Sequence, residues 1–274
     1  MEEAPKGRVL IVAGSDPSGG AGIQADIKTV TALGGYAAAA ITALTIQDTQ
    51  GVTGVMPIPA DFVADQMKAV LADIGADCIK TGMLYDTATI HAVADVIIED
   101  AHSAALIVDP VMMATSGDAL VQSGAIDLLK VRMFPLATLV TPNIIEASLL
   151  TGIEIKGISD MIKAGEVMLA AGAEAVLVKG GHLSGNRLAD ILISPDGAPI
   201  IIESHRISTR HTHGTGCTLA SAVAALLAQG LPLEQAFRQA HDYVRRAIEL
   251  APGFGKGHGP LGHAAAASFL HDQN

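Results

Sequence analysis

The stretch Thr212-His213-Gly214-Thr215-Gly216-Cys217-Thr218-Leu219 leads into the small and apolar run Ala220-Ser221-Ala222-Val223-Ala224-Ala225-Leu226-Leu227-Ala228. After Gly216 no helix breaker occurs until Gly230, and leucine and valine recur at the spacing of one helical face. We predict a helix that starts at Cys217. The two glycines before it let backbone N–H groups turn toward one point, where the positive end of the helix dipole also lies. This combination is typical of a site that binds an anion, phosphate above all.

The same segment has two other interpretations. An ordinary turn followed by a helix cap would also account for the glycines, and Cys217 would then be an inert buried thiol. His211, His213 and Cys217 could instead be considered as zinc ligands, since histidine and thiolate are preferred zinc donors. Their spacing matches no standard zinc site and no fourth ligand suggests itself, so a phosphate loop accounts better for the glycines.

Composition limits the class of protein. Half of the 274 residues are apolar, which is enough for one large α/β domain. The balance of 17 Lys and Arg against 28 Asp and Glu gives a net charge of −11, which disfavours binding to nucleic acid or to an anionic membrane. Aromatic residues make up only 3% of the chain, so stacking platforms for single-stranded nucleic acid are scarce. A phosphorylated ligand would need local donors and a divalent cation to offset its charge.

The sequence shows no targeting signal. It contains no run of about 18 uncharged apolar residues and no signal-peptide pattern over residues 1–6. Cys78 and Cys217 are far apart and form no disulfide framework, which fits a reducing compartment. We therefore expect a cytoplasmic protein.

Apolar runs that end in glycine or proline alternate with helical patterns, which predicts a mostly parallel sheet covered by helices on both faces. The expected strands are residues 8–13, 38–44, 78–80, 106–108, 139–141 and 175–178, with a short extended segment at 52–58 and a hairpin of 191–193 and 200–202. The expected helices are residues 23–34, 62–74, 161–169, 217–229 and 233–250. We expect one domain over residues 1–274 with a small lid of short strands, and a flexible loop at 253–259 that could cover a nucleotide.

Ligands of open parallel sheets bind beyond the carboxyl ends of the strands. The polar residues that directly follow apolar runs are Asp16, Lys80, Asp109, Asn143, Glu146 and Lys179. Acidic residues at these positions could hold Mg²⁺, and a lysine could bind phosphate. Each also has a structural interpretation; Asn143 and Glu146, for example, have the spacing of a helix capping box.

Known nucleotide motifs fit the chain poorly. It has no G-x-x-x-x-G-K-[ST] phosphate loop. Residues 20–25 match the loose dinucleotide pattern, and Asp48 follows at about the distance expected for a ribose ligand. That pattern should directly follow a strand, whereas residues 14–19 intervene here. A dehydrogenase is therefore a minority alternative.

Seven motifs occur in an order that is specific when taken together: residues 13–26, 41–44 with Gln47, 80–84, 109–112, 141–143 with Glu146, 178–182 and 212–218. This set closely resembles the hydroxymethylpyrimidine/phosphomethylpyrimidine kinase family of the ribokinase-like superfamily, from about Val9 to Gly262. The resemblance implies a three-layer α/β sandwich, with a mostly parallel central sheet, helices on both faces and a few short lid or edge strands.

The resemblance also implies an activity. The enzyme would use ATP and Mg²⁺ to phosphorylate the hydroxymethyl group of 4-amino-5-hydroxymethyl-2-methylpyrimidine, and then the resulting monophosphate, in thiamine biosynthesis. It further implies a homodimer. Pyridoxal kinase is the nearest alternative, because pyridoxal is a ring of similar size with a similar hydroxymethyl group. A non-catalytic nucleotide or pyrimidine sensor is the alternative from another class.

The resemblance assigns roles to particular residues. The catalytic group would be Gly214, Gly216, Cys217 and Lys179; the ATP-binding group Asn143, Glu146, Lys179, Thr212 and Thr215; the magnesium ligands Glu146 and Asp109; and the substrate-binding group Gly14, Asp26, Gln47 and Met83.

Two of these residues carry specific hypotheses. The amide of Gln47 offers a donor and an acceptor that complement an aminopyrimidine edge. Most sugar-kinase relatives end the glycine motif with an aspartate as general base, whereas this chain has Cys217. We hypothesise a thiolate, favoured by the helix dipole, that takes or orients the hydroxyl proton.

Overall fold

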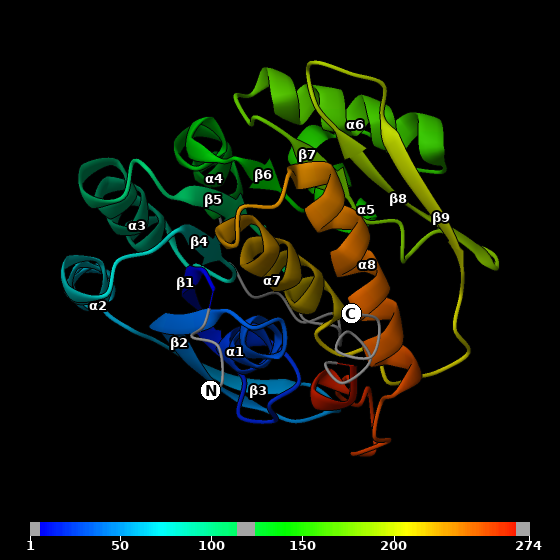
Figure 1. Ribbon diagram of the computed structural model, residues 1–274, viewed down its shortest axis with the longest axis horizontal. Coiled ribbons are helices and arrows are strands. Elements are labelled where there is room, and N and C mark those ends of the chain that lie inside the picture. Colours follow the sequence, from blue (N-terminus) through cyan, green and yellow to red (C-terminus); the bar gives the residue numbers. More distant parts are fainter. Residues whose placement is uncertain (1–5, 114–123, 267–274) are drawn as a thin grey trace.

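The computed structural model describes residues 6–113 and 124–266. Within these residues a nine-stranded sheet has the order β3-β2-β1-β4-β5-β6-β7-β8-β9 (Figure 1). The strands are β1 (Arg8–Ser15), β2 (Tyr36–Gln47), β3 (Val52–Pro57), β4 (Cys78–Thr81), β5 (Ala105–Val108), β6 (Leu139–Val140), β7 (Val176–Val178), β8 (Arg187–Ile193) and β9 (Ile200–His205). The six central strands are parallel, and β3, β8 and β9 add antiparallel edges.

Helices cover both faces of the sheet (Figure 1). One face carries α2 (Ala60–Asp73), α3 (Thr87–Asp100), α4 (Ala125–Arg132), α5 (Ile144–Thr151) and α6 (Ile158–Ala170). The other carries α1 (Gly22–Ala32), α7 (Thr215–Ala228) and α8 (Leu233–Glu249). The predicted three-layer α/β fold is therefore confirmed. Among the residues that the structure describes, no helix is both long and apolar enough to cross a membrane.

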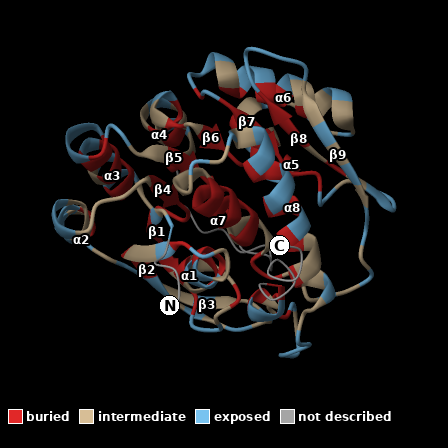
Figure 2. Ribbon diagram, in the orientation of Figure 1, coloured by how far each residue is buried: buried red, intermediate tan, exposed pale blue. Residues whose placement is uncertain are grey.

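The strands separate two hydrophobic clusters by simple alternation. In β1, Leu10 and Val12 join the cluster beneath α2–α6, whereas Val9 and Ile11 join the cluster beneath α1, α7 and α8. Successive side chains of a strand point to opposite faces, so a continuous apolar run serves both clusters at once. Figure 2 shows most of α7 buried, with intermediate exposure at its ends, as expected for a helix that packs on the sheet between α1 and α8.

The parallel strands all end at the same edge of the sheet. The residues that follow β1, β5 and β7 are Asp16, Asp109 and Lys179, and all three are buried. Thus the polar residues predicted to follow apolar runs meet at one edge, as the parallel topology requires.

Most predicted elements are confirmed, including the β8–β9 hairpin, but the helices differ in two respects. Helix α7 begins at Thr215 rather than Cys217, because Gly214 caps it with φ +82° and Gly216 fits within its first turn. Helices α3, α4 and α5 were missed, although the spacing of Asn143 and Glu146 had indicated the capping box of α5. The β-branched residues of α3 favour a strand, although Asp86 caps the helix by accepting a hydrogen bond from Thr89 N at 2.8 Å. Helix α4 is too short, at eight residues, for a clear periodic pattern.

We expect Phe237→Ala to lower the free energy of unfolding by about 3–5 kcal/mol, because it leaves a cavity in the hydrophobic cluster that α8 shares with α7. Phe62→Ala is the matched control: that ring is 59% exposed on α2, and its loss should change the free energy of unfolding by no more than about 0.5 kcal/mol. Urea denaturation followed by circular dichroism measures both. Equal losses in the two variants would contradict the assignment of α8 to the core.

Candidate active site

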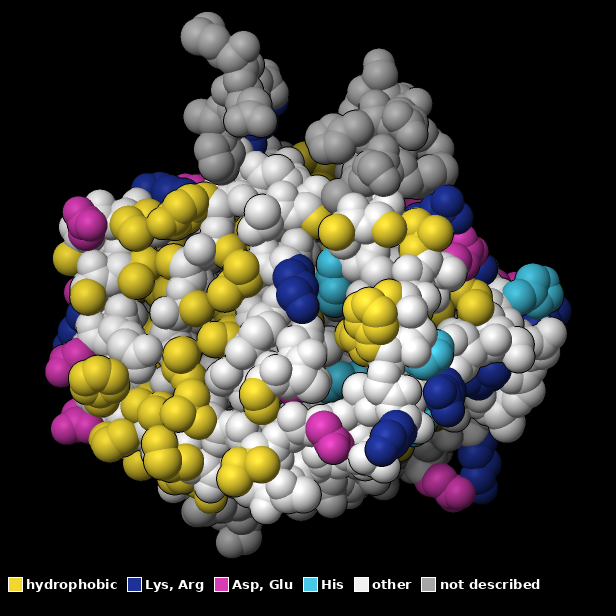
Figure 3. Space-filling model, turned by 90° about the horizontal axis from the view of Figure 1, so that it is seen from below, with side chains coloured by type: hydrophobic (Ala, Val, Ile, Leu, Met, Phe, Trp, Pro, Cys, Tyr) yellow, Lys and Arg dark blue, Asp and Glu magenta, His cyan; other side chains and the backbone are white. Residues whose placement is uncertain are grey.

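A cavity of about 670 Å³ opens at the carboxyl edge of the sheet. It brings together twelve of the thirteen predicted site residues: Gly14, Gln47, Met83, Asp109, Asn143, Glu146, Lys179, Thr212, Gly214, Thr215, Gly216 and Cys217. Figure 3 shows histidine and basic side chains around the hollowed part of one face, with hydrophobic side chains gathered on its other half.

The first turn of α7 forms the anion-binding end of this cavity. Gly214 must be glycine for two reasons: its φ is +82°, and a Cβ there would lie 1.8 Å from the carbonyl oxygen of Gly20. A Cβ on Gly216 would lie 3.0 Å from Lys179 Nζ, so the ammonium group lies against the start of the helix. The first N–H groups of a helix lack acceptors within it, and together with this lysine they suit a phosphate group.

Lys179 is held by a buried ion pair. Its Nζ lies 2.9 Å from Asp109 Oδ1, which also accepts a hydrogen bond from Thr141 Oγ1 at 3.1 Å. Burial opposes both charges, but Lys179 lowers the pKa of Asp109 and Asp109 raises the pKa of Lys179. The pair is therefore ionised at neutral pH.

Asn143 and Glu146 form the capping box of α5 and also line the cavity. Asn143 Oδ1 accepts from Glu146 N at 3.0 Å, and Glu146 Oε2 accepts from Asn143 N at 2.8 Å. Burial raises the pKa of Glu146 to about 7, and the nearby Asp109 carboxylate adds to the effect. The structural and functional interpretations of these two residues are thus both compatible with the geometry.

The acidic residues fit a magnesium ion that is completed by phosphate and water. Asp109 Oδ2 is buried and has no hydrogen-bond partner among the described residues, so it has a lone pair available for a cation. The described ranges contain no group of three or more His, Cys, Asp or Glu side chains arranged to hold a metal. This gives no support to the zinc alternative. Mg²⁺ commonly uses only one or two carboxylates together with substrate phosphates.

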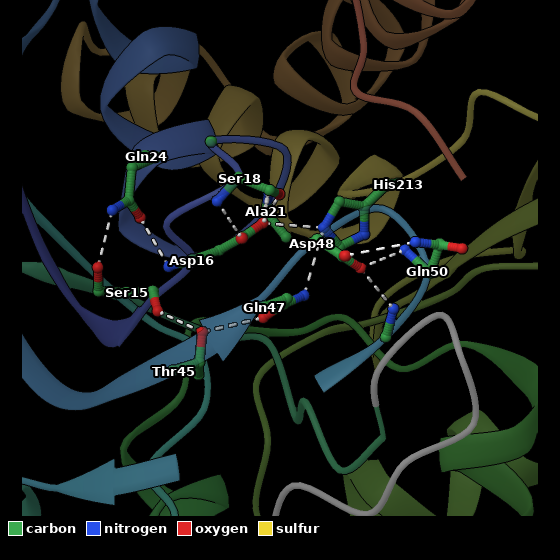
Figure 4. Close-up of polar contacts among 12 residues, drawn as sticks. Ser15, Asp16, Ser18, Ala21, Gln24, Thr45, Gln47, Asp48, Gln50 and His213 are labelled. Atoms are coloured by element: carbon green, nitrogen blue, oxygen red, sulfur yellow. Dashed lines mark hydrogen bonds and ion pairs between the residues drawn. The ribbon is translucent and has the colours of Figure 1, made fainter. Parts of the chain in front are cut away.

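Gln47, Asp16 and His213 meet in the same cavity, directly before the first turn of α7 (Figure 4). His213 Nε2 lies 2.8 Å from Asp16 Oδ2 and 3.4 Å from Gln47 Nε2, while Thr45 Oγ1 lies 3.2 Å from Gln47 Oε1. Burial alone would raise the pKa of Asp16, but hydrogen bonds from His213 and Ser18 outweigh it and the pKa lies below its ordinary value. The contact between Asp16 and His213 was not foreseen, because 197 residues separate them.

Met83 lies beside the Gly14 backbone, and both residues line the cavity. A Cβ on Gly14 would lie 2.5 Å from Met83 Cε, so the glycine makes room for the methionine. The loop of residues 253–259 lies nearby: His258 N donates to Thr49 O at 2.7 Å, and a Cβ on Gly257 would lie 2.0 Å from that oxygen. This loop therefore lies against the β2–β3 turn, close to Gln47. Its closure over a nucleotide stays a prediction.

Asp26 is the predicted site residue that does not line the cavity. It lies on the inner face of α1, where both carboxylate oxygens are 3.0 Å from Lys80 Nζ and Oδ1 accepts from Ser221 Oγ at 2.6 Å. These partners occupy the carboxylate and the side chain is fully buried. In this structure Asp26 contacts Lys80 and Ser221 instead of lining the cavity, and the predicted substrate contact stays a prediction.

The thiol of Cys217 also differs from its hypothesis. Burial raises the pKa of Cys217 to about 12; Lys80 opposes this shift, while Asp26 and Asp109 reinforce it. We expected the helix N-terminus to favour a thiolate, but loss of hydration outweighs the dipole here. The group is a neutral thiol at physiological pH.

Residues of β8, β9 and α8 complete the cavity and were missed from the sequence. Asp190 Oδ1 accepts from Gly180 N at 2.8 Å and so fixes the backbone directly after Lys179. Arg206 donates to the carbonyl oxygens of Gly181, Leu183 and Gly185, at 3.1, 2.6 and 3.1 Å. No local motif marks these residues, since only the sheet order brings them to the site.

The fold and the site define a ribokinase-like kinase, in which a phosphate site at a helix N-terminus faces the carboxyl edge of the sheet. The family model for phosphomethylpyrimidine kinase matches residues 16–262, and the chain belongs to this family. The dehydrogenase alternative is therefore not supported; its glycine pattern also begins five residues after β1 ends at Ser15.

Known relatives agree with this family. The thiamine biosynthesis bifunctional protein ThiED of Geobacter sulfurreducens is 50% identical over 270 residues, which cover 98% of this chain but 54% of that protein. The chain thus spans about half the length of that relative. The hydroxymethylpyrimidine/phosphomethylpyrimidine kinase of Rhizobium meliloti is 47% identical over 93% of this chain and 96% of its own length. A solved ADP complex of Bacillus subtilis pyridoxal kinase superposes with a TM-score of 0.87 at 35% identity, and covers 95% of this chain and 98% of that one.

We expect Gly214→Ala to reduce turnover more than tenfold, because the added methyl group would collide with Gly20 O and displace the first turn of α7. Gly34→Ala is the matched control, since Gly34 has a similar φ of +80° but nothing within 4 Å of an added Cβ. It should cost about 1 kcal/mol of stability through backbone strain alone and leave turnover nearly unchanged. Steady-state kinetics and thermal unfolding separate the two effects.

We expect iodoacetamide to modify Cys217 at pH 8 at least about tenfold more slowly than a free thiol, because only the thiolate reacts and burial holds the pKa near 12. The rate should still be rising at pH 9.5. Mass spectrometry of the intact protein measures it, with Cys217→Ala as the control for any reaction at the fully buried Cys78. Rapid modification with a midpoint below pH 8 would contradict the neutral thiol.

Proposed function

We propose that this protein transfers the terminal phosphoryl group of ATP to the hydroxymethyl group of 4-amino-5-hydroxymethyl-2-methylpyrimidine, and then phosphorylates the monophosphate to the diphosphate. The observation that carries this proposal is the arrangement of one cavity. Lys179 and the start of α7 lie at its anion-binding part, and Gln47 lies at the end formed by β2. Family membership and the kinases that share its sequence and fold support the same activity.

Phosphoryl transfer depends mainly on positioning and on stabilising negative charge. The backbone N–H groups of Gly214, Gly216 and Cys217 would face the transferred group, whereas Thr215 N already donates to Thr212 O at 3.3 Å. Lys179 would supply a positive charge beside them. Thr212 and Thr215 would fix the shape of this turn, since Thr215 Oγ1 donates to Thr212 O at 2.7 Å. Asp109 and Glu146 would hold Mg²⁺, which supplies charge neutralisation to the phosphates when bound.

Cys217 would orient the substrate hydroxyl as a neutral hydrogen-bonding thiol. Its raised pKa argues against a thiolate base, and a loose transition state places little demand on early removal of the hydroxyl proton. The backbone amides and Lys179 then make the main contribution to catalysis.

Substrate recognition would centre on Gln47. Its amide carries a donor beside an acceptor, which matches the amino group and ring nitrogen of an aminopyrimidine. His213, itself held by Asp16, lies against this amide and would limit its rotation. Met83 would cover an apolar face of the ring. Pyridoxal lacks the amino group that pairs with an amide acceptor, so we expect it to be the poorer substrate.

We further propose that the chain acts as one kinase domain, since the sheet is continuous from β3 to β9 across the described residues. A homodimer and a cytoplasmic location stay predictions from the resemblance and from the sequence.

An ATP-coupled assay with the aminopyrimidine alcohol, and with pyridoxal in parallel, tests the function. We expect pyrimidine-dependent ATP consumption, with mass spectrometry detecting products that carry one and then two phosphoryl groups. Faster turnover of pyridoxal would favour the pyridoxal kinase alternative. ATP binding without pyrimidine-dependent consumption would favour the non-catalytic sensor.

A further inference from the structure

Lys80 is a fully buried lysine for which the proposed chemistry has no role so far. It lies at the third position of β4 and points to the face covered by α1 and α7, where its Nζ is 3.0 Å from both carboxylate oxygens of Asp26. The same Nζ lies 3.8 Å from Asp109 Oδ2, and Lys80 forms part of the cavity lining. One cation thus lies between a carboxylate behind the site and a carboxylate within it.

Asp109 is bonded on one side only. Oδ1 accepts from Lys179 at 2.9 Å and from Thr141 at 3.1 Å. Oδ2 accepts no hydrogen bond from any described residue and faces Lys80. A buried carboxylate is costly unless a cation stays close to it, so Asp109 depends on whichever lysine remains.

Lys179 lies between Asp109 and the place where a phosphate would bind. Its ammonium already lies against the first turn of α7, where phosphate would bind. A phosphate group in that position competes with Asp109 for the same charge. As Lys179 turns toward the phosphate, Asp109 would keep only the proposed Mg²⁺ to offset its buried charge, unless Lys80, 3.8 Å from Oδ2, also stays beside it.

We propose that Lys80 is a positioning residue that serves as the reserve counter-ion of Asp109, so that Lys179 is free to shift to the nucleotide phosphates. Asp26 and Ser221 anchor this reserve cation: Ser221 Oγ donates to Asp26 Oδ1 at 2.6 Å, and Asp26 holds Lys80 with both oxygens. The four charges alternate from Asp26 through Lys80 and Asp109 to Lys179, at separations of 3.0, 3.8 and 2.9 Å. The inference rests on the proposed kinase function and gives Asp26 an indirect role in it.

A purely structural role for Lys80, as the partner of Asp26, is the competing explanation. Lys80→Met alone cannot separate the two, because it leaves the Asp26 carboxylate unpaired in the core and so destabilises the fold itself. Lys80→Met/Asp26→Asn removes both charges of the buried pair and keeps a hydrogen-bond acceptor for Ser221. Asp26→Asn alone is the matched variant, since it keeps Lys80 beside Asp109.

The experiment compares Asp26→Asn with Lys80→Met/Asp26→Asn. Thermal unfolding first establishes that both fold. Calorimetric titration with a non-hydrolysable ATP analogue should then show at least about tenfold weaker binding in the double variant, with a matching rise in the KM for ATP and less than about a threefold change in the KM for the pyrimidine. Equal nucleotide affinity in the two variants would overturn the proposal and leave Lys80 a structural residue.

A thermodynamic cycle with Asp109→Asn provides the second measurement. In the Asp26→Asn/Asp109→Asn background no carboxylate needs a reserve cation, so adding Lys80→Met should change nucleotide affinity by no more than about twofold. The same large loss in both backgrounds would also overturn the proposal. Wild-type enzyme assayed with the pyrimidine distinguishes the two levels of inference: if it binds nucleotide but does not phosphorylate the pyrimidine, the proposed function fails, while the binding comparison still tests Lys80.

Discussion

The close approach of two backbones, at Gly20 and Gly214, is the constraint on which the site depends. No side chain fits between them, because a Cβ on Gly214 would overlap the Gly20 carbonyl. The contact holds the loop after β1 against the start of α7, two segments nearly two hundred residues apart. The Asp16 and His213 side chains meet at the same junction, so the Gln47 side of the cavity and the first turn of α7 share one support.

Much of this arrangement follows from the sequence because the sheet is parallel. An apolar run buried on both faces is a strong local signal for a strand. The residues that directly follow parallel strands all lie at the same edge of the sheet. Asp109 and Lys179 could therefore be placed together without knowing the helices between them. The glycine that caps α7 was equally informative, since a positive φ and a close approach both demand glycine at 214.

The remainder depends on burial, which local sequence does not reveal. Cys217 stands at a helix N-terminus, and that position predicts a lowered pKa; desolvation by its neighbours reverses the direction. Asp26 falls within a family motif, yet the helical spacing of α1 directs its carboxylate into the protein toward Lys80. Asp190 lies in β8 and Arg206 directly follows β9, and the place of these strands beside the site is set by sheet order alone. In each case the deciding partner is distant in sequence.

The loop of residues 253–259 has a consequence for how the protein is made. It packs on Thr49 through backbone contacts that leave no space for a side chain on Gly257, and Gly259 O accepts from His213 N at 3.1 Å. Translation proceeds from the N-terminus, so β1 and β2 leave the ribosome long before this loop exists. The β2–β3 turn and the segment before α7 therefore lack their contacts with this loop until nearly the whole polypeptide has emerged. A chain arrested before that point would contain every residue of the predicted phosphate site and still lack the loop that packs on Thr49, beside Gln47.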